Sequence, residues 1–223
     1  MLPEHTIFWA FYQQQTIQSL SLEKLNILID EFNQQGYLLT NGYAYPFDEP
    51  ENIIKESGEI QILIESVSQL NQSSSNSFNF WQPNFEFTLL FTNHEKSGTN
   101  WMVGVEDKTF IGQTEASSIQ NTLKFLEAIK LALTYFSPFY GCTLFSEERP
   151  YSDKVFNLEI EEIYEINFYG SSYIQKFSKE SLLSAPAWKI EEISEGILLI
   201  PSIQAIYDYD AESLARVQEH LIS

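Results

Sequence analysis

Residues 118–136, SIQNTLKFLEAIKLALTYF, repeat apolar side chains at the three- and four-residue spacing of an α-helix. Pro138 follows two residues later and is expected to end the helix, because proline cannot continue the hydrogen-bond ladder. The apolar stripe is wide, which is typical of a helix packed on a sheet. We therefore predict a long central helix over 118–136, with one side formed by Leu123, Leu126, Ile129, Ala132, Leu133 and Phe136.

Two segment pairs on either side of this helix have the pattern of β-hairpins. Residues 85–91 and 101–106 are rich in strand-forming side chains and are joined by the turn-rich stretch 93–98. Residues 187–193 and 197–200 flank Ser-Glu-Gly in the same way. Antiparallel pairing is therefore expected on both sides of the central helix.

The first part of the chain predicts a helix followed by shorter elements. A helix is expected over 21–35, with Gly36 as its C-terminal cap. A short strand over 37–40, a tight turn at Asn41-Gly42 and an aromatic loop over 43–52 should follow. We also predict a strand over 60–65.

The last third predicts alternating elements. Residues 155–168 are strand-like, with a bulge or turn at Glu161-Glu162. A helix should open near Ser172 and end before Pro186, and Asp210 should cap a short terminal helix. Together these elements predict an α+β fold, with a mixed, mainly antiparallel sheet packed by the long helix and several shorter helices. We expect one domain over residues 1–223, with a flexible Ser/Asn/Gln-rich loop at about 69–77.

The charge balance restricts the class of partner. The 223 residues include 12 Lys or Arg and 31 Asp or Glu, which gives a formal net charge of −19. Binding to nucleic acid or to an anionic membrane requires clustered basic residues, so both are disfavoured. We expect a cytoplasmic protein, because no long apolar run or charged leader is visible and a single cysteine, Cys142, forms no internal disulfide, which fits a reducing compartment. Cys142 lies among apolar neighbours. The same neighbours predict that Cys142 is a buried core residue rather than a nucleophile.

No familiar catalytic constellation is recognisable. His5, His94 and His220 share no metal-ligand spacing, and neither a glycine-rich phosphate loop nor a nucleophile elbow occurs. We therefore name no catalytic residue, expect neither a metal nor a cofactor, and favour a non-enzymatic role.

The carboxylates between positions 147 and 165 form the main candidate site. The simplest interpretation is a solvated surface, as on a housekeeping protein with no catalytic activity, and docking of a basic partner, such as a basic toxin domain, comes next. A carboxylate-dependent hydrolase or a calcium site is also open, although the regular calcium-loop spacing is missing. The net charge favours docking over catalysis, because a hydrolase needs only two carboxylates. The candidate partner-binding residues are Glu147, Glu148, Asp153, Glu159, Glu161, Glu162 and Glu165, with Tyr43 and Tyr45 from the aromatic loop.

Residues 167–200 carry a resemblance to a known family. The segment reads NFYG at 167–170, then Tyr173, Phe177, LLSAPA at 182–187, and a hairpin that ends in Leu198-Leu199. It resembles the C-terminal signature of an α+β immunity-protein family from bacterial polymorphic toxin systems. The family pattern has proline after the glycine and glycine after the phenylalanine, whereas this chain has Ser171 and Ser178.

The resemblance implies a function as well as a fold. Proteins of such a family bind and block a cognate toxin, with no cofactor and no catalytic residues. The motif residues themselves are expected to be structural. Gly170 would allow a close turn, Tyr173 and Phe177 would anchor a small helix, and Pro186 would terminate it.

Overall fold

The computed structural model describes residues 5–11, 22–45, 75–94, 98–145, 152–159, 162–204 and 210–222. The helices are α1 (Leu22–Gln34), η2 (Asp107–Thr109), α3 (Glu115–Tyr135), α4 (Ser152–Phe156), α5 (Ser171–Phe177), α6 (Lys179–Leu183) and α7 (Ala211–Ile222). The strands are β1 (His5–Phe11), β2 (Leu38–Tyr45), β3 (Ser75–Gln82), β4 (Phe85–His94), β5 (Gly98–Glu106), β6 (Tyr140–Phe145), β7 (Asn167–Tyr169), β8 (Lys189–Ile193) and β9 (Gly196–Ile200).

The strands form one nine-stranded sheet in the order β2-β3-β4-β5-β1-β6-β7-β9-β8. Each neighbouring pair of strands is antiparallel. The α+β class and the mainly antiparallel sheet are therefore confirmed. The first strand of the chain, β1, lies near the middle of the sheet between β5 and β6, so distant parts of the sequence meet there.

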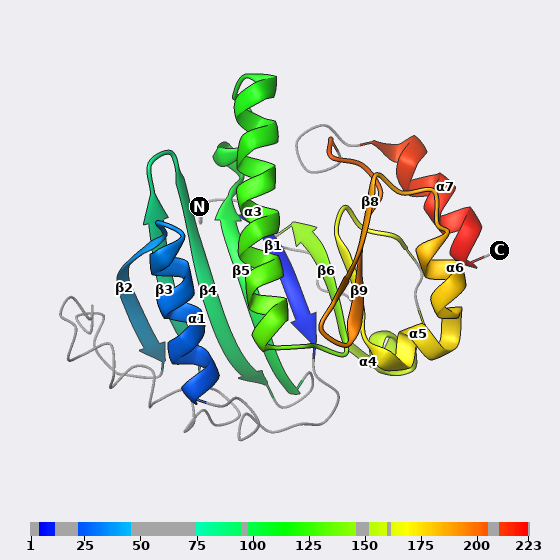
Figure 1. Ribbon diagram of the computed structural model, residues 1–223, viewed down its shortest axis with the longest axis horizontal. Coiled ribbons are helices and arrows are strands. Elements are labelled where there is room, and N and C mark those ends of the chain that lie inside the picture. Colours follow the sequence, from blue (N-terminus) through cyan, green and yellow to red (C-terminus); the bar gives the residue numbers. More distant parts are fainter. Residues whose placement is uncertain are drawn as a thin grey trace.

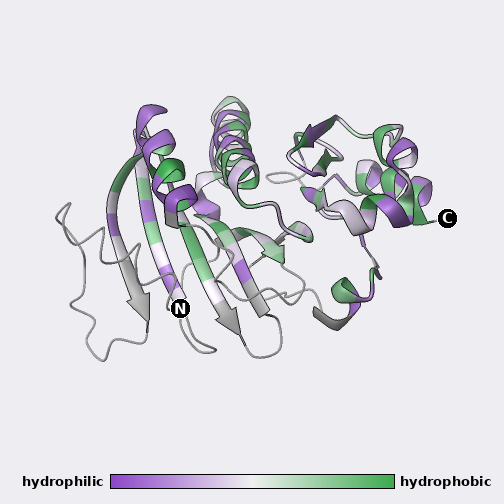
Figure 2. Ribbon diagram, turned by 60° about the horizontal axis from the view of Figure 1, so that its bottom comes forward, coloured by the Kyte–Doolittle hydropathy of each residue, from purple (hydrophilic) through white to green (hydrophobic). Residues whose placement is uncertain are grey.

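The sheet buries a different core on each face. Successive side chains of a strand point to opposite faces, and β1 accordingly sends Phe8 to one core and Trp9 to the other. The helices α1 and α3 pack on the Phe8 face (Figure 1, Figure 2). Side chains of α5, α6 and α7 pack with Trp9 on the other face, toward the end of the sheet that carries β7 and β9. The sheet is thus covered on opposite faces over its two halves.

The predicted central helix is confirmed as α3. Its N-terminal cap is Thr114, whose Oγ1 accepts a hydrogen bond from the Ser117 amide at 3.3 Å. The predicted stripe is buried except for Leu123, which is 44% exposed. No helix in the part of the chain that the structure describes is long and apolar enough to cross a bilayer.

Other predicted elements are also confirmed. The structure contains α1, the β4–β5 and β8–β9 hairpins, and α7. Asp210 caps α7, because its Oδ1 accepts from the Ser213 amide at 3.0 Å. Cys142 is fully buried in the second core, as predicted, and this burial raises the pKa of its thiol.

The prediction of a turn and a loop over residues 41–52 was wrong for residues 41–45, which are the ones that the structure describes. Asn41 and Gly42 lie inside β2 rather than in a turn, and the strand continues to Tyr45. The strand β2 pairs with β3 from Leu38 to Tyr45, with an irregularity in the register between Leu39 and Asn41. Pairing with a distant strand thus overrides the local turn signal. The predicted strand at 60–65 and most of the predicted loop at 69–77 lie outside the described residues, whereas 75–77 belong to β3.

The last third also differs from prediction. Residues 155–168 do not form one strand: α4 occupies 152–156, and strand pairing begins only at Asn167. The predicted helix before Pro186 is divided into α5 and α6 at Ser178, which has φ 65° and ψ 143°. This conformation is costly for a residue with a Cβ atom, and the Ser178 Oγ offsets part of that cost by accepting from the Ser181 amide at 3.1 Å.

We expect Ser178→Gly to stabilise the protein by about 1 kcal/mol, because glycine removes the strain and loses only a few tenths as a cap. Chemical denaturation measures the free energy of unfolding. Ser172→Gly is the control, since Ser172 lies inside α5, outside the positive-φ region, and glycine there should destabilise by about 0.5–1 kcal/mol. Destabilisation by both substitutions would contradict the assignment of strain to Ser178.

Candidate functional site

The acidic segment, residues 147–165, includes α4 and ends shortly before β7, and its described carboxylates do not share one environment. Glu159 and Glu162 are exposed. Asp153 is in α4, whereas Glu147, Glu148 and Glu161 lie outside the described residues. Their assignment to partner binding stays a prediction.

Glu165 is placed differently, because it is only 8% exposed. Thr143 of β6 donates its hydroxyl to the Glu165 carboxylate at 3.1 Å, and the same Oγ1 accepts from the Ile166 amide at 2.9 Å. The carboxylate therefore ties the start of β7 to β6. In this conformation Glu165 does not contribute to an exposed acidic face.

The segment that carries Glu159 is held against α5. Tyr173 donates its hydroxyl to the Val155 carbonyl at 2.7 Å, and Lys176 donates to the Leu158 carbonyl. Leu158 itself has a positive φ of 62°, which turns the chain at the end of the α4 segment. Glu159 is thus presented from a fixed backbone rather than from a free loop.

Asn167 at the start of β7 fixes the residues after Glu162. Its Oδ1 accepts from the Tyr164 amide at 3.0 Å, and its Nδ2 donates to the Tyr164 carbonyl at 2.6 Å. Asn167 is fully buried, and the oxygen and the nitrogen of its side-chain amide both have a hydrogen-bond partner inside the protein. Two residues of the 167–200 motif, Tyr173 and Asn167, therefore position the two exposed glutamates.

Glycine is required at position 170 because there is no room for a Cβ atom, and not because of its dihedral angles. Its φ of −74° and ψ of −179° suit any residue, but a Cβ atom would lie 2.7 Å from the carbonyl oxygens of Pro138 and Phe139. The Gly170 amide also donates to the Phe139 carbonyl at 3.1 Å. Gly170 thus lies where the connection from β7 to α5 passes close to the backbone of Pro138 and Phe139.

The other motif residues lie around α5 and α6. Tyr173 is fully buried, and its ring contacts the ring of Tyr140 at a centroid distance of 4.9 Å. Phe177 stacks on Tyr173 at 6.3 Å. Pro186 is exposed, and α6 already ends at Leu183.

Tyr43 and Tyr45 belong to β2, opposite Ser77 and Ser75 of β3 in the register. The strand β2 is at one edge of the nine-stranded sheet, and five strands separate it from β7. The structure therefore does not bring these tyrosines together with the acidic segment.

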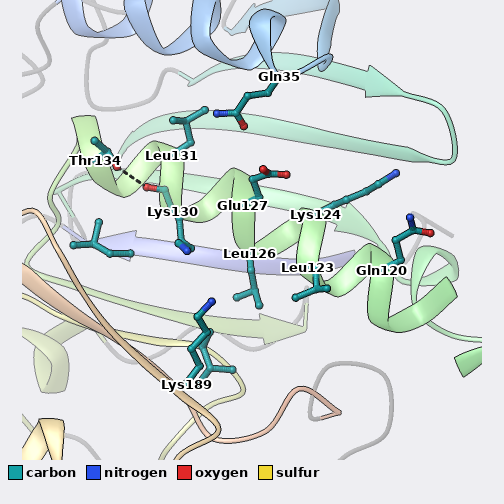
Figure 3. A pocket seen from close by; sticks show the side chains of 12 residues that line it. Gln35, Gln120, Leu123, Lys124, Leu126, Glu127, Lys130, Leu131, Thr134 and Lys189 are labelled. Atoms are coloured by element: carbon teal, nitrogen blue, oxygen red, sulfur yellow. Dashed lines mark hydrogen bonds between the residues drawn. The ribbon is translucent and has the colours of Figure 1, made fainter. Parts of the chain in front are cut away.

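A groove beside α3 was missed by sequence reasoning. It has a volume of about 510 Å³ and is lined by residues of α3, by residues of the β8–β9 hairpin and by Gln35, which directly follows α1 (Figure 3). Two of its lysines, Lys130 and Lys189, are far apart in the sequence and meet at one carboxylate, that of Glu191. No local spacing signals such a pair.

The described part of the chain contains no group of three or more His, Cys, Asp or Glu side chains arranged to hold a metal ion. His220 of α7 lies with its Nε2 3.1 Å from the Ser181 carbonyl and 3.4 Å from the Ser184 hydroxyl. The Ser184 hydroxyl donates to the same Ser181 carbonyl at 3.2 Å, so in this conformation its proton is directed to the carbonyl oxygen rather than to His220.

Comparison with known proteins extends the description of the fold. No protein-family model and no curated protein sequence matches the chain. Among solved structures, the fold is similar to that of Pseudomonas aeruginosa T6SS protein PA0821, with a TM-score of 0.55 and 11% sequence identity. The likeness covers 99% of this chain and 72% of the other. At 11% sequence identity, the comparison shows that the two proteins share a fold and nothing more.

Proposed function

We propose that this chain is a non-enzymatic binding protein of the immunity type, which neutralises a partner protein through an acidic surface that includes Glu159 and Glu162. The proposal rests on the exposure of these two carboxylates and on the hydrogen bonds that hold the backbone beside them. Both are exposed, and the backbone beside each is held by hydrogen bonds to residues of the 167–200 motif.

The charge of the whole chain supports a basic partner. With a net charge of −19, the protein attracts a positively charged surface over a distance of about a Debye length, which raises the association rate. A fixed backbone also reduces the entropy lost when the partner binds. Long-range attraction, together with a backbone that is held in place beside Glu159 and Glu162, suits selective protein docking.

The backbone around the motif supports the family resemblance. The family pattern has glycine at position 178, where the backbone has a positive φ that favours glycine. The pattern has proline at position 171, which is the first residue of α5 and the helical position that proline favours. The fold likeness to a T6SS protein fits the same interpretation.

No observation among the described residues favours a carboxylate-dependent hydrolase. Glu165 is engaged by Thr143, and Glu159 and Glu162 are exposed. We therefore propose binding and not hydrolysis.

Capture and growth assays test this function. The tagged chain is used to capture proteins from native lysate at low and at high salt, and each captured protein is then expressed in a bacterial host with and without the chain. We expect one basic protein to be captured at low salt and released at high salt, and its toxicity to be relieved by co-expression.

A matched pair of variants locates the surface. Glu159→Gln with Glu162→Gln should weaken capture several-fold, whereas Glu23→Gln with Asp30→Asn removes the same charge from exposed positions on α1, at the other end of the sheet (Figure 1). Absence of any captured protein at low salt would overturn the function. Equal weakening by both pairs would overturn the role of the acidic segment.

A further inference from the structure

The two walls of the groove are formed by α3 and by the β8–β9 hairpin, and direct contacts join these two elements. The hairpin is fastened to α3 at its tip, where Ser194 donates its hydroxyl to the Thr134 carbonyl at 3.1 Å. It is fastened again where Glu191 of β8 pairs with Lys130 of α3, with 2.7 Å between Nζ and Oε2. These contacts hold the two walls at a fixed separation.

The groove is basic in a strongly acidic protein. Among the described residues that line it, three are basic, Lys124, Lys130 and Lys189, and one is acidic, Glu127. Lys124 points away from the other two, and its Nζ donates to the Pro83 carbonyl at 3.3 Å (Figure 3). The positive charge that remains within the groove is therefore that of Lys130 and Lys189.

Lys130 and Lys189 converge on one carboxylate. Lys189 Nζ lies 2.9 Å from Glu191 Oε1, and Lys130 binds the other oxygen. Burial raises the pKa of Glu191, but its contacts with both lysines outweigh burial and lower the pKa overall. Glu191 therefore stays charged and holds both ammonium groups in place, and these three side chains together carry one positive charge. Glu127, the acidic side chain that lines the groove, points away from Lys130 and Lys189 and accepts a hydrogen bond from the Tyr37 hydroxyl at 2.9 Å (Figure 3).

The ion pairs with Glu191 do not use all the N–H donors of the two ammonium groups. Each carries three N–H donors, and an ion pair with Glu191 uses only part of this capacity. Both side chains are half-buried, and they extend toward one another in the groove (Figure 3). An anion placed beside them would receive charge-assisted hydrogen bonds from two directions.

Apolar side chains line the part of the groove next to Lys130 and Lys189. Leu126 and Ile200 are buried, Ile193 is half-buried, and Leu123 exposes 44% of its surface toward the open groove. An apolar chain that covered Leu123 would remove its surface from water, which favours binding. The volume of about 510 Å³ lies within the range of about 300–1,000 Å³ that is usual for small-molecule sites.

We propose that this groove binds a small amphipathic carboxylate, with its head group at Lys130 and Lys189 and its apolar body along Leu123, Leu126 and Ile193. The size of the groove favours a small molecule over a protein segment. This site is separate from the acidic segment and does not depend on the function proposed above.

Calorimetric titration of the full chain with decanoate tests the site, with decan-1-ol as a probe of the same chain length without charge. Decanoate should bind at least tenfold more tightly than decan-1-ol. Lys189→Gln should weaken decanoate binding about tenfold, and Lys108→Gln, which removes an exposed lysine outside the groove, should leave it unchanged.

Leu123→Glu is a second variant, chosen because an exposed side chain can be replaced without a large loss of stability. It places a negative charge and removes apolar surface at the groove, and it should abolish decanoate binding. Binding of decanoate no tighter than that of decan-1-ol would overturn the proposal, as would binding unaffected by Lys189→Gln and Leu123→Glu. The readout is a small-molecule affinity, so its failure leaves the capture experiment untouched.

Discussion

Trp101→Ala is expected to lower the free energy of unfolding by about 4 kcal/mol, because truncation of a fully buried tryptophan removes a large apolar surface and leaves a cavity. Trp101 is 0% exposed on β5 and packs against Phe8 of β1, with ring centroids 5.6 Å apart. Its Nε1 donates to the Phe136 carbonyl at 3.2 Å, where α3 ends. One side chain therefore joins the first strand, the sheet centre and the long helix.

Chemical denaturation monitored by circular dichroism measures this loss. Trp81→Ala is the matched control, because Trp81 on β3 is 43% exposed and its truncation should cost less than about 1 kcal/mol. Similar losses for the two tryptophans would contradict the packing described here.

Gly170→Ala is expected to destabilise by about 3 kcal/mol, although alanine tolerates the backbone angles at this position. The added methyl group would lie 2.7 Å from two carbonyl oxygens, those of Pro138 and Phe139. Backbone oxygens in a packed turn cannot rotate away as a flexible side chain can. The connection between β7 and α5 would therefore have to move, and the acidic segment held by α5 would move with it.

The free energy of unfolding of Gly170→Ala is compared with that of Gly104→Ala. Gly104 lies on β5, and a Cβ atom there would meet nothing closer than Ile7 Cγ1 at 3.8 Å, which is an ordinary contact. We expect the Gly104 variant to stay within about 1 kcal/mol of the wild type. If both variants unfold alike, Gly170 is not required by the close approach of the two carbonyls.

Elements specified by local sequence could be predicted. The periodicity of 118–136 and the cap at Asp210 depend on neighbouring residues, and α3 and α7 form as expected. Elements that depend on distant pairing could not be predicted. The position of β1 between β5 and β6, and the continuation of β2 through Asn41-Gly42, are decided by strands far away in the chain.

The candidate site shows the same division. A run of carboxylates is visible in the sequence, but which of them are exposed depends on the fold: Glu165 turns inward to Thr143, whereas Glu159 and Glu162 face solvent. The convergence of Lys130 and Lys189 on Glu191 has no local signature, because it requires the β8–β9 hairpin to pack on α3.

The most direct test of the account is the rate constant with which the captured partner associates with the chain, measured by stopped flow as salt is raised. If an acidic surface guides docking, the rate constant should fall by about tenfold or more between low and high salt, since screening removes the long-range attraction. It should also be lower for Glu159→Gln with Glu162→Gln than for Glu23→Gln with Asp30→Asn. A rate constant that is independent of salt and equal in the two variants would contradict docking through the acidic segment.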